Sequence, residues 1–162
     1  MATFRLLDSY IAGSSVSSVT FSNIDQTYSD LQIIVKGRST RVSDNDSLEL
    51  RPNASTSNSY ALALSGNTTG SGGSSTSGYN FGATNRGIAW AALTGWNRPG
   101  NYYSPITIYI RDYASTSLNK PMHGIGGMAT NSTNQYKGFS TFIYDQSTAI
   151  TSLQFLAANG NI

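Results

Sequence analysis

Cysteine is absent from this 162-residue chain, and charged side chains make up only 11% of it. Without thiols the chain has no disulfide framework, no cysteine–zinc site and no thiol nucleophile. An ordinary soluble domain carries about 25% charged residues, yet the hydrophobic fraction here is only 38%. The sequence contains no run of ~18 apolar residues, so we predict no membrane-spanning helix. The net charge of +2 comes without a basic cluster, so we expect no nucleic-acid and no membrane partner.

Groups suited to acid–base catalysis are also few. The chain has eight acidic residues, of which only Glu49 is a glutamate, and His123 is its one histidine. A glycoside hydrolase needs a pair of placed carboxyl groups, and a serine hydrolase of the nucleophile-elbow type needs a Gly-x-Ser-x-Gly motif that this sequence lacks. We therefore expect a protein that is not an enzyme, with no catalytic or cofactor-binding residue, and we predict that His123 does no chemistry.

Two short motifs resemble ligand sites but have the wrong context. Asp44-Asn45-Asp46 looks like a loop for a hard cation, but an EF-type calcium loop needs glycine at its sixth position and glutamate at its twelfth. Here the sixth residue is Glu49, which favours a polar turn leading into a strand and no metal. Gly124–Ala129 matches Gly-x-Gly-x-x-Ala, but a dinucleotide site also needs a preceding strand and a following helix, which its polar flanks do not predict.

Hydrophobic side chains alternate with a period of two, which predicts β-strands. Turn residues such as Asp44-Asn45-Asp46 and Arg98-Pro99-Gly100-Asn101 separate these segments at regular intervals. About nine or ten short strands with this spacing are typical of a sandwich or barrel, so we predict an all-β protein with a jelly-roll-like β-sandwich. The expected strands fall within 31–36, 47–51, 60–64, 106–111 and 141–145, with weaker ones at Phe4–Tyr10, Val16–Phe21, Ile88–Leu93 and Ile150–Leu156.

The whole chain, 1–162, is expected to form one domain. Its one low-complexity segment, rich in glycine, serine and threonine over 68–84, offers few apolar side chains to bury, so we predict a surface loop there. The alternating positions should line one shared core, since a period of two puts them on one face of each strand. These positions are Leu31, Ile33, Val35, Leu48, Leu50, Leu62, Leu64, Ile106, Ile108, Ile110, Phe142 and Leu153.

Aromatic residues gather in and before one loop. Trp90 is in phase with Ile88 and is expected in the core. Trp and Tyr beside arginine are the residues that most often carry the energy of an interface, and aromatic rings also stack on sugars. The candidate interface residues are therefore Trp96, Arg98, Tyr102 and Tyr103.

Several segments, in order, give the chain a family resemblance. Gln26-Thr27-Tyr28-Ser29-Asp30-Leu31 runs into an apolar strand, and with the other segments it resembles a family of small virion structural proteins of tailed bacteriophages, especially cyanophages. The resemblance covers most of the chain except the Gly/Ser segment. Its further segments are Leu6–Tyr10, Val16–Phe21, Leu48–Arg51 with Asn53 and Tyr60, Ile106–Ile110, Asp112–Ser115 and Ser147–Leu153.

This resemblance implies a non-enzymatic virion component. We expect an oligomeric capsid decoration or cement protein, a trimer in our assignment, whose partners are its own copies and other virion proteins such as the major capsid protein. The alternative is a receptor-binding or carbohydrate-binding module of a tail or fibre, with a host-surface glycan as its ligand. The N-terminal residues show no basic segment followed by an apolar run, so we expect synthesis in the host cytoplasm without a signal peptide and residence in the virion.

The sequence departs from the family pattern after its last expected strand. The family pattern continues into a short final strand, whereas here a hairpin signal, Asn159-Gly160, is followed by two residues. Two interpretations stay open: a further strand follows Ile162, or Ile150–Leu156 lacks a local partner and pairs with another chain.

Overall fold

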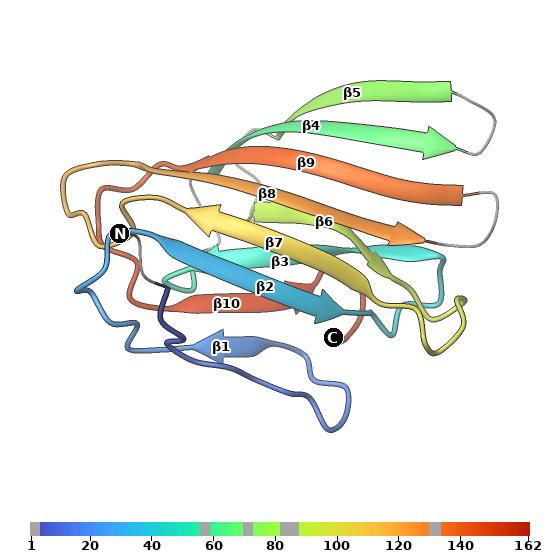
Figure 1. Cartoon of the computed structure of the whole chain (residues 1–162), viewed down its shortest axis with the longest axis horizontal. Helices are drawn as coiled ribbons and strands as arrows, with labels where there is room; N and C mark the ends of the chain where they lie inside the picture. Colours follow the sequence, from blue (N-terminus) through green and yellow to red (C-terminus); the bar gives the residue numbers. More distant parts are fainter. Residues whose placement is uncertain (1–3, 56–58, 70–72, 82–87, 130–133) are drawn as a thin grey trace.

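A computed structural model describes residues 4–55, 59–69, 73–81, 88–129 and 134–162, and within them the side chains of 4–55, 93–127, 139 and 141–162. The described part is all-β and contains no helix; its ten strands form two antiparallel sheets (Figure 1). The strands are β1 (Val19–Phe21), β2 (Leu31–Gly37), β3 (Asn45–Pro52), β4 (Ser59–Thr69), β5 (Gly73–Phe81), β6 (Ile88–Thr94), β7 (Ser104–Ile110), β8 (Lys120–Ala129), β9 (Asn134–Tyr144) and β10 (Leu153–Ala157).

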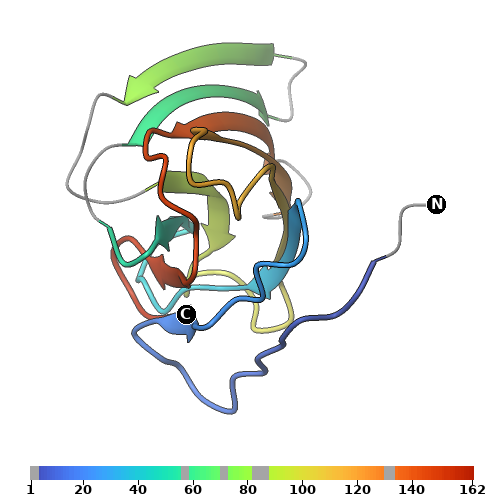
Figure 2. The same cartoon turned by 90° about the vertical axis from the view of Figure 1, so that its left-hand side faces the viewer.

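The two sheets differ in size and curvature. The smaller has the order β1-β10-β3-β6, and the larger has the order β2-β7-β8-β9-β4-β5. Figure 2 shows the six-stranded sheet curling as a half-barrel around the four-stranded one. The core lies between the concave face of the larger sheet and the inner face of the smaller one.

The strand pairs are nested. Strand β4 pairs with β5, β3 with β6, β2 with β7 and β1 with β10, all antiparallel. The chain thus forms one long two-stranded ribbon whose tip is the β4–β5 hairpin and whose other pairs are split between two sheets. The β8–β9 hairpin is an addition to this ribbon, and it lies between β7 and β4 in the larger sheet.

The predicted surface loop over 68–84 is wrong for most of its length. Strand β5 occupies Gly73–Phe81 and pairs with β4 over nine residues, from Thr69 opposite Gly73 to Ala61 opposite Phe81. Composition misled the prediction because β5 is the last strand of its sheet, where the backbone ladder with β4 holds it without the apolar alternation of an inner strand.

At the N-terminus, less of the chain is strand than the sequence predicts. The strand expected at Phe4–Tyr10 does not form, and β1 is shorter than Val16–Phe21. Every residue from Phe4 to Ser15 is exposed. The apolar side chains that predicted a strand here therefore face solvent.

Ile150–Leu156 lacks a local partner, as expected, but the expectation that this leaves it free to pair with another chain is wrong. Strand β10 is paired on both sides, with Phe155 opposite Val19 of β1 and opposite Leu50 of β3. Both partners lie more than 100 positions away, so local hairpin chemistry could not reveal them. The Asn159-Gly160 signal serves instead to bring the chain against Ser39, whose Oγ would lie 2.5 Å from a Cβ on Gly160.

The predicted core is confirmed at every predicted position whose side chain the structure describes. Eight of the twelve positions are buried together, and Ile33 and Val35 pack against them as partly buried neighbours. The side chains of Leu62, Leu64 and Trp90 lie outside the described residues. The buried eight are Leu31, Leu48, Leu50, Ile106, Ile108, Ile110, Phe142 and Leu153.

One cation is buried beside this core. Lys120 at the start of β8 is fully buried, and its Nζ donates hydrogen bonds to the carbonyl oxygens of Leu118 (2.7 Å) and Gln146 (3.0 Å). Burial disfavours the charged ammonium, so it lowers the pKa of Lys120 from its ordinary value. The folded state therefore releases this proton at a lower pH than the unfolded state does.

This difference predicts a pH dependence of stability. Between the lowered pKa of Lys120 and the ordinary lysine value of about 10.4, the unfolded chain binds more protons, so the free energy of unfolding gains a contribution that rises with pH. One proton gives a slope of at most about 1.4 kcal/mol per pH unit. Lys120→Met should remove that contribution in urea titrations at several alkaline pH values. If the free energy of unfolding of Lys120→Met depends on pH as steeply as that of the wild type, Lys120 does not make this contribution.

The comparison is best made in a Tyr113→Phe background. Tyr113 is fully buried, its hydroxyl donates to the Asp25 carbonyl, and burial raises the pKa of this phenol. Its contribution has the opposite sign, because stability falls as pH rises above the ordinary tyrosine pKa of about 10. In the Tyr113→Phe background, the pH dependence of stability therefore reports the contribution of Lys120 without the opposing contribution of Tyr113.

Candidate interaction site

The candidate interface residues lie in the loop between β6 and β7, Gly95–Tyr103, whose two ends are joined by a buried hydroxyl pair. The Thr94 amide donates to Ser104 Oγ (2.9 Å), and the two hydroxyl oxygens are 3.1 Å apart. Both residues are fully buried. The loop therefore starts and ends at fixed positions.

The segment that precedes β3 forms backbone hydrogen bonds with this loop. The Trp96 amide donates to the Arg41 carbonyl (2.8 Å), and the Gly95 amide donates to the Asp44 carbonyl (3.1 Å). A Cβ at Gly95 would lie 2.1 Å from the Ser43 carbonyl oxygen, so only glycine allows this approach. The backbone under the Trp96 ring is thus tightly constrained.

Arg38, which directly follows β2, holds the loop from inside. Its guanidinium donates to the carbonyl oxygens of Gly95 (3.3 Å), Arg98 (3.1 Å) and Pro99 (3.3 Å). The same group lies 5.8 Å from the centre of the Trp96 ring, within the range of a cation–π contact. Trp96 is nevertheless 62% exposed, so it is an oriented aromatic side chain whose surface remains open.

Tyr103 repeats this arrangement at the end of the loop. It is 45% exposed, and Lys36 Nζ of β2 lies 5.6 Å from its ring centre. We call Lys36, Arg38, Trp96 and Tyr103 the aromatic–cationic patch. Its two aromatic rings each lie beside a cation.

The other two candidate residues are placed differently. Tyr102 is half-buried, and its amide closes a turn by donating to the Pro99 carbonyl (3.0 Å). The Arg98 side chain is only 11% exposed and forms an ion pair with Asp44 (2.5 Å). Both shape the loop, whereas Trp96 and Tyr103 form its accessible surface.

Sequence reasoning missed Lys36 and Arg38. The signal was present, because Lys36 continues the outward phase of Gln32 and Ile34 along β2. What the sequence could not reveal is that the end of β2 meets the β6–β7 loop, which the isolated bridge between Arg38 and Thr94 now shows.

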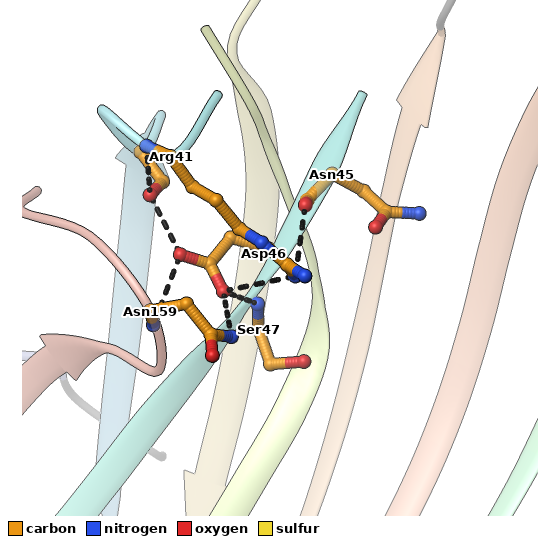
Figure 3. Close-up of polar contacts among 6 residues, drawn as sticks. Arg41, Asn45, Asp46, Ser47 and Asn159 are labelled. Carbon is orange, nitrogen blue, oxygen red and sulfur yellow. Dashed lines mark hydrogen bonds and ion pairs between the residues drawn. The ribbon is translucent and has the colours of Figure 1, made fainter. Parts of the chain in front are cut away.

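The suspected cation loop at Asp44-Asn45-Asp46 is a network of protein hydrogen bonds (Figure 3). The buried Asp46 carboxylate accepts from Ser39 Oγ (2.7 Å), the Ser47 amide (2.9 Å), and the amide (3.2 Å) and side chain (2.9 Å) of Asn159. Arg41 Nη1 lies 3.8 Å from Asp46 Oδ1. These donors occupy the acceptor positions of the carboxylate, which ties the segment under Trp96 to the C-terminal region.

His123 lies on the outer face of the larger sheet. Its ring stacks on that of Tyr109 at 5.0 Å, with an angle of 19° between the planes. The glycine-rich stretch that follows it is part of strand β8, not the start of a helix, so the dinucleotide geometry is absent there. That His123 does no chemistry stays a prediction.

Comparisons with known proteins give no relative. No family model matches the chain, and no curated protein and no solved structure matches it significantly. Among the described side chains, no three histidine, aspartate or glutamate groups gather as metal ligands. The described residues also contain no helix of the length and apolarity that crossing a membrane requires.

Proposed function

We propose that this chain is a non-enzymatic structural protein of a bacteriophage virion, an oligomeric capsid decoration or cement protein built as a jelly-roll-like β-sandwich. The carrying observation is the aromatic–cationic patch, in which Trp96 is oriented by Arg38 and by the loop backbone while most of its surface stays open. Ordered aromatic side chains beside arginine are typical of the residues that dominate binding energy.

The strand pairing supports the jelly-roll part of the proposal. A jelly roll has eight strands in two sheets, and without β8 and β9 this chain has eight, in the orders β1-β10-β3-β6 and β2-β7-β4-β5. The four nested antiparallel pairs are what a long ribbon acquires when it is rolled into two layers. The resemblance of the sequence to phage virion proteins supports the setting.

The charge of the patch indicates the kind of partner. Lys36 and Arg38 flank the two rings, so the patch fits an acidic, partly apolar surface. A protein that binds only the assembled lattice stabilises it by mass action. Since a lattice repeats this surface many times, the same modest contact acts at each position.

The double variant Trp96→Ala/Tyr103→Ala tests the patch. We expect binding to capsids that lack the protein to weaken by about 2 kcal/mol or more, roughly 30-fold, because each change removes an ordered aromatic side chain. The melting temperature should stay nearly the same, since both rings are exposed. Sedimentation of the purified protein with capsids measures the loss, and Leu118→Ala, another exposed apolar residue on the β7–β8 connection, is the control.

A tail or fibre module that binds a carbohydrate is the second candidate, favoured by the exposed rings of Trp96 and Tyr103. The double variant separates the two functions. If it binds capsids normally but loses binding on a glycan array, the receptor-binding function replaces the decoration function. Copy number per particle separates them again, because a lattice protein occurs in hundreds of copies and a fibre protein in far fewer.

A further inference from the structure

Two apolar surfaces of this chain are exposed, and neither belongs to the aromatic–cationic patch. The first is the N-terminal arm, which we define as Phe4–Ser15. All twelve of its residues, 4 to 15 inclusive, are exposed, and Figure 2 shows the arm running away from both sheets. Its large apolar side chains are Phe4 (83% exposed), Leu6, Leu7, Tyr10 and Ile11 (92% exposed).

Backbone hydrogen bonds hold the point where the arm joins the rest of the chain, although every residue of the arm is exposed. The Val16 amide donates to the Ile162 carbonyl and the Ile162 amide donates to the Val16 carbonyl, both at 2.9 Å. Further out, Arg5 donates to the Tyr28 hydroxyl at an exposed site (3.2 Å). The arm therefore leaves the body from a defined point and presents its apolar side chains to solvent.

The second surface is the outer face of the larger sheet. Ile34, Thr107, Ile125 and Phe139 stand opposite one another in a row across β2, β7, β8 and β9. Ile34 is 75% and Ile125 61% exposed. The adjacent row carries the stacked rings of Tyr109 and His123. We call this the outer apolar face.

We propose that the arm of one copy covers the outer apolar face of a second copy, so that the protein self-associates by exchange of arms. This deepens the proposed function and rests on its premise that the chain works as an oligomer. The length fits, because twelve extended residues reach roughly 40 Å, whereas four strands span about 15–20 Å.

The area fits as well. A stable interface takes about 800 Å² from each partner, and one aromatic side chain alone buries about 150–250 Å². Five large apolar side chains, two of them aromatic, reach that order when covered. Exchanged arms also give a closed assembly, in which each copy donates one arm and receives one. The exposed apolar area of both surfaces is then removed from water together.

The absence of native cysteine makes a direct test clean. Full-length Leu6→Cys protein is mixed with full-length Ile125→Cys protein and oxidised mildly. We expect a disulfide-linked heterodimer at least tenfold more abundant than from Leu6→Cys mixed with Leu118→Cys, the matched control. Equal yields from the two mixtures would overturn the proposal. So would a double variant, Leu6→Cys/Ile125→Cys, that forms its disulfide only within one chain, because the arm would then cover its own sheet.

Sedimentation of the purified chain supplies the second measurement. Leu6→Asp and Ile125→Asp should each weaken self-association at least tenfold, with Leu118→Asp as the control and circular dichroism to verify the fold. A wild-type chain that is monomeric at every concentration would overturn the proposal, as would association that Ile125→Asp leaves intact. Capsids are absent here, so failure leaves the lattice-binding function untouched. Trp96→Ala/Tyr103→Ala tests that function with self-association preserved.

Discussion

Replacing Asp46 by alanine should lower the free energy of unfolding by about 3–5 kcal/mol, because its carboxylate is the shared acceptor of four hydrogen bonds and a hydrogen bond to a charged group contributes about 1.5–3 kcal/mol. The Asp46 side chain is fully buried and accepts four hydrogen bonds, from Ser39, Ser47 and twice from Asn159. Alanine leaves the buried Ser39 hydroxyl without its acceptor and removes the acceptor of the half-buried Ser47 amide, and an unsatisfied buried group costs about 1–3 kcal/mol. Urea denaturation with circular dichroism measures the change.

The neighbouring carboxylate provides a matched control. Asp44 pairs with Arg98, but its own side chain is 54% exposed. Asp44→Ala should therefore cost less, about 1–3 kcal/mol, because it removes a single ion-pair partner of the largely buried Arg98. Asp46→Asn should fall between the two, because the amide keeps one acceptor oxygen and turns a donor toward the others. If Asp46→Ala and Asp44→Ala cost the same, the network in Figure 3 does not stabilise the fold.

Truncating Ile108 to alanine should cost about 2–5 kcal/mol. Ile108 is fully buried in the middle of β7, opposite Ile33 of β2 on one side and Gly124 of β8 on the other. Because Gly124 has no side chain to move into the space, the resulting cavity should stay open, which places the cost in the upper part of this range.

Two further variants serve as controls for the Ile108→Ala measurement. Ile108→Val removes a single methylene and should cost about 0.5–1.5 kcal/mol. Val42→Ala makes a comparable truncation at a position that is largely exposed, and it should change stability by no more than about 0.5 kcal/mol. A small loss for Ile108→Ala would mean that the larger sheet presents its other face to the core.

The parts of the fold that depend on local pattern could be predicted from the sequence. Ile106, Ile108 and Ile110 alternate so regularly that their burial followed directly, and the shared core was confirmed. The candidate loop was also located correctly, although its role as an interface stays a prediction. These successes share one cause, since the period of a strand and the chemistry of a turn are written within a few residues.

What failed depends on residues far apart. The strand at Gly73–Phe81 has no apolar alternation and is held by pairing with β4. The partners of β10 lie at the other end of the sequence and in β3. The cations beside Trp96 and Tyr103 come from β2, some 60 residues before the loop. No single window of sequence contains these contacts, so only the folded chain reveals them.

The position of β10 also sets an order of events. This strand, Leu153–Ala157, lies between β1 and β3, so the four-stranded sheet has no continuous ladder until residue 157 has left the ribosome. Until then β1 has no neighbour in its sheet, and the edge of β3 that faces away from β6 has no partner strand. Pairings of such long range are slow to form, since the entropy of closing the loop is lost before any contact stabilises it. Of the ten described strands, β10 is therefore both the last in sequence and the one that closes the smaller sheet, so this sheet is completed only after the other nine strands have been synthesised.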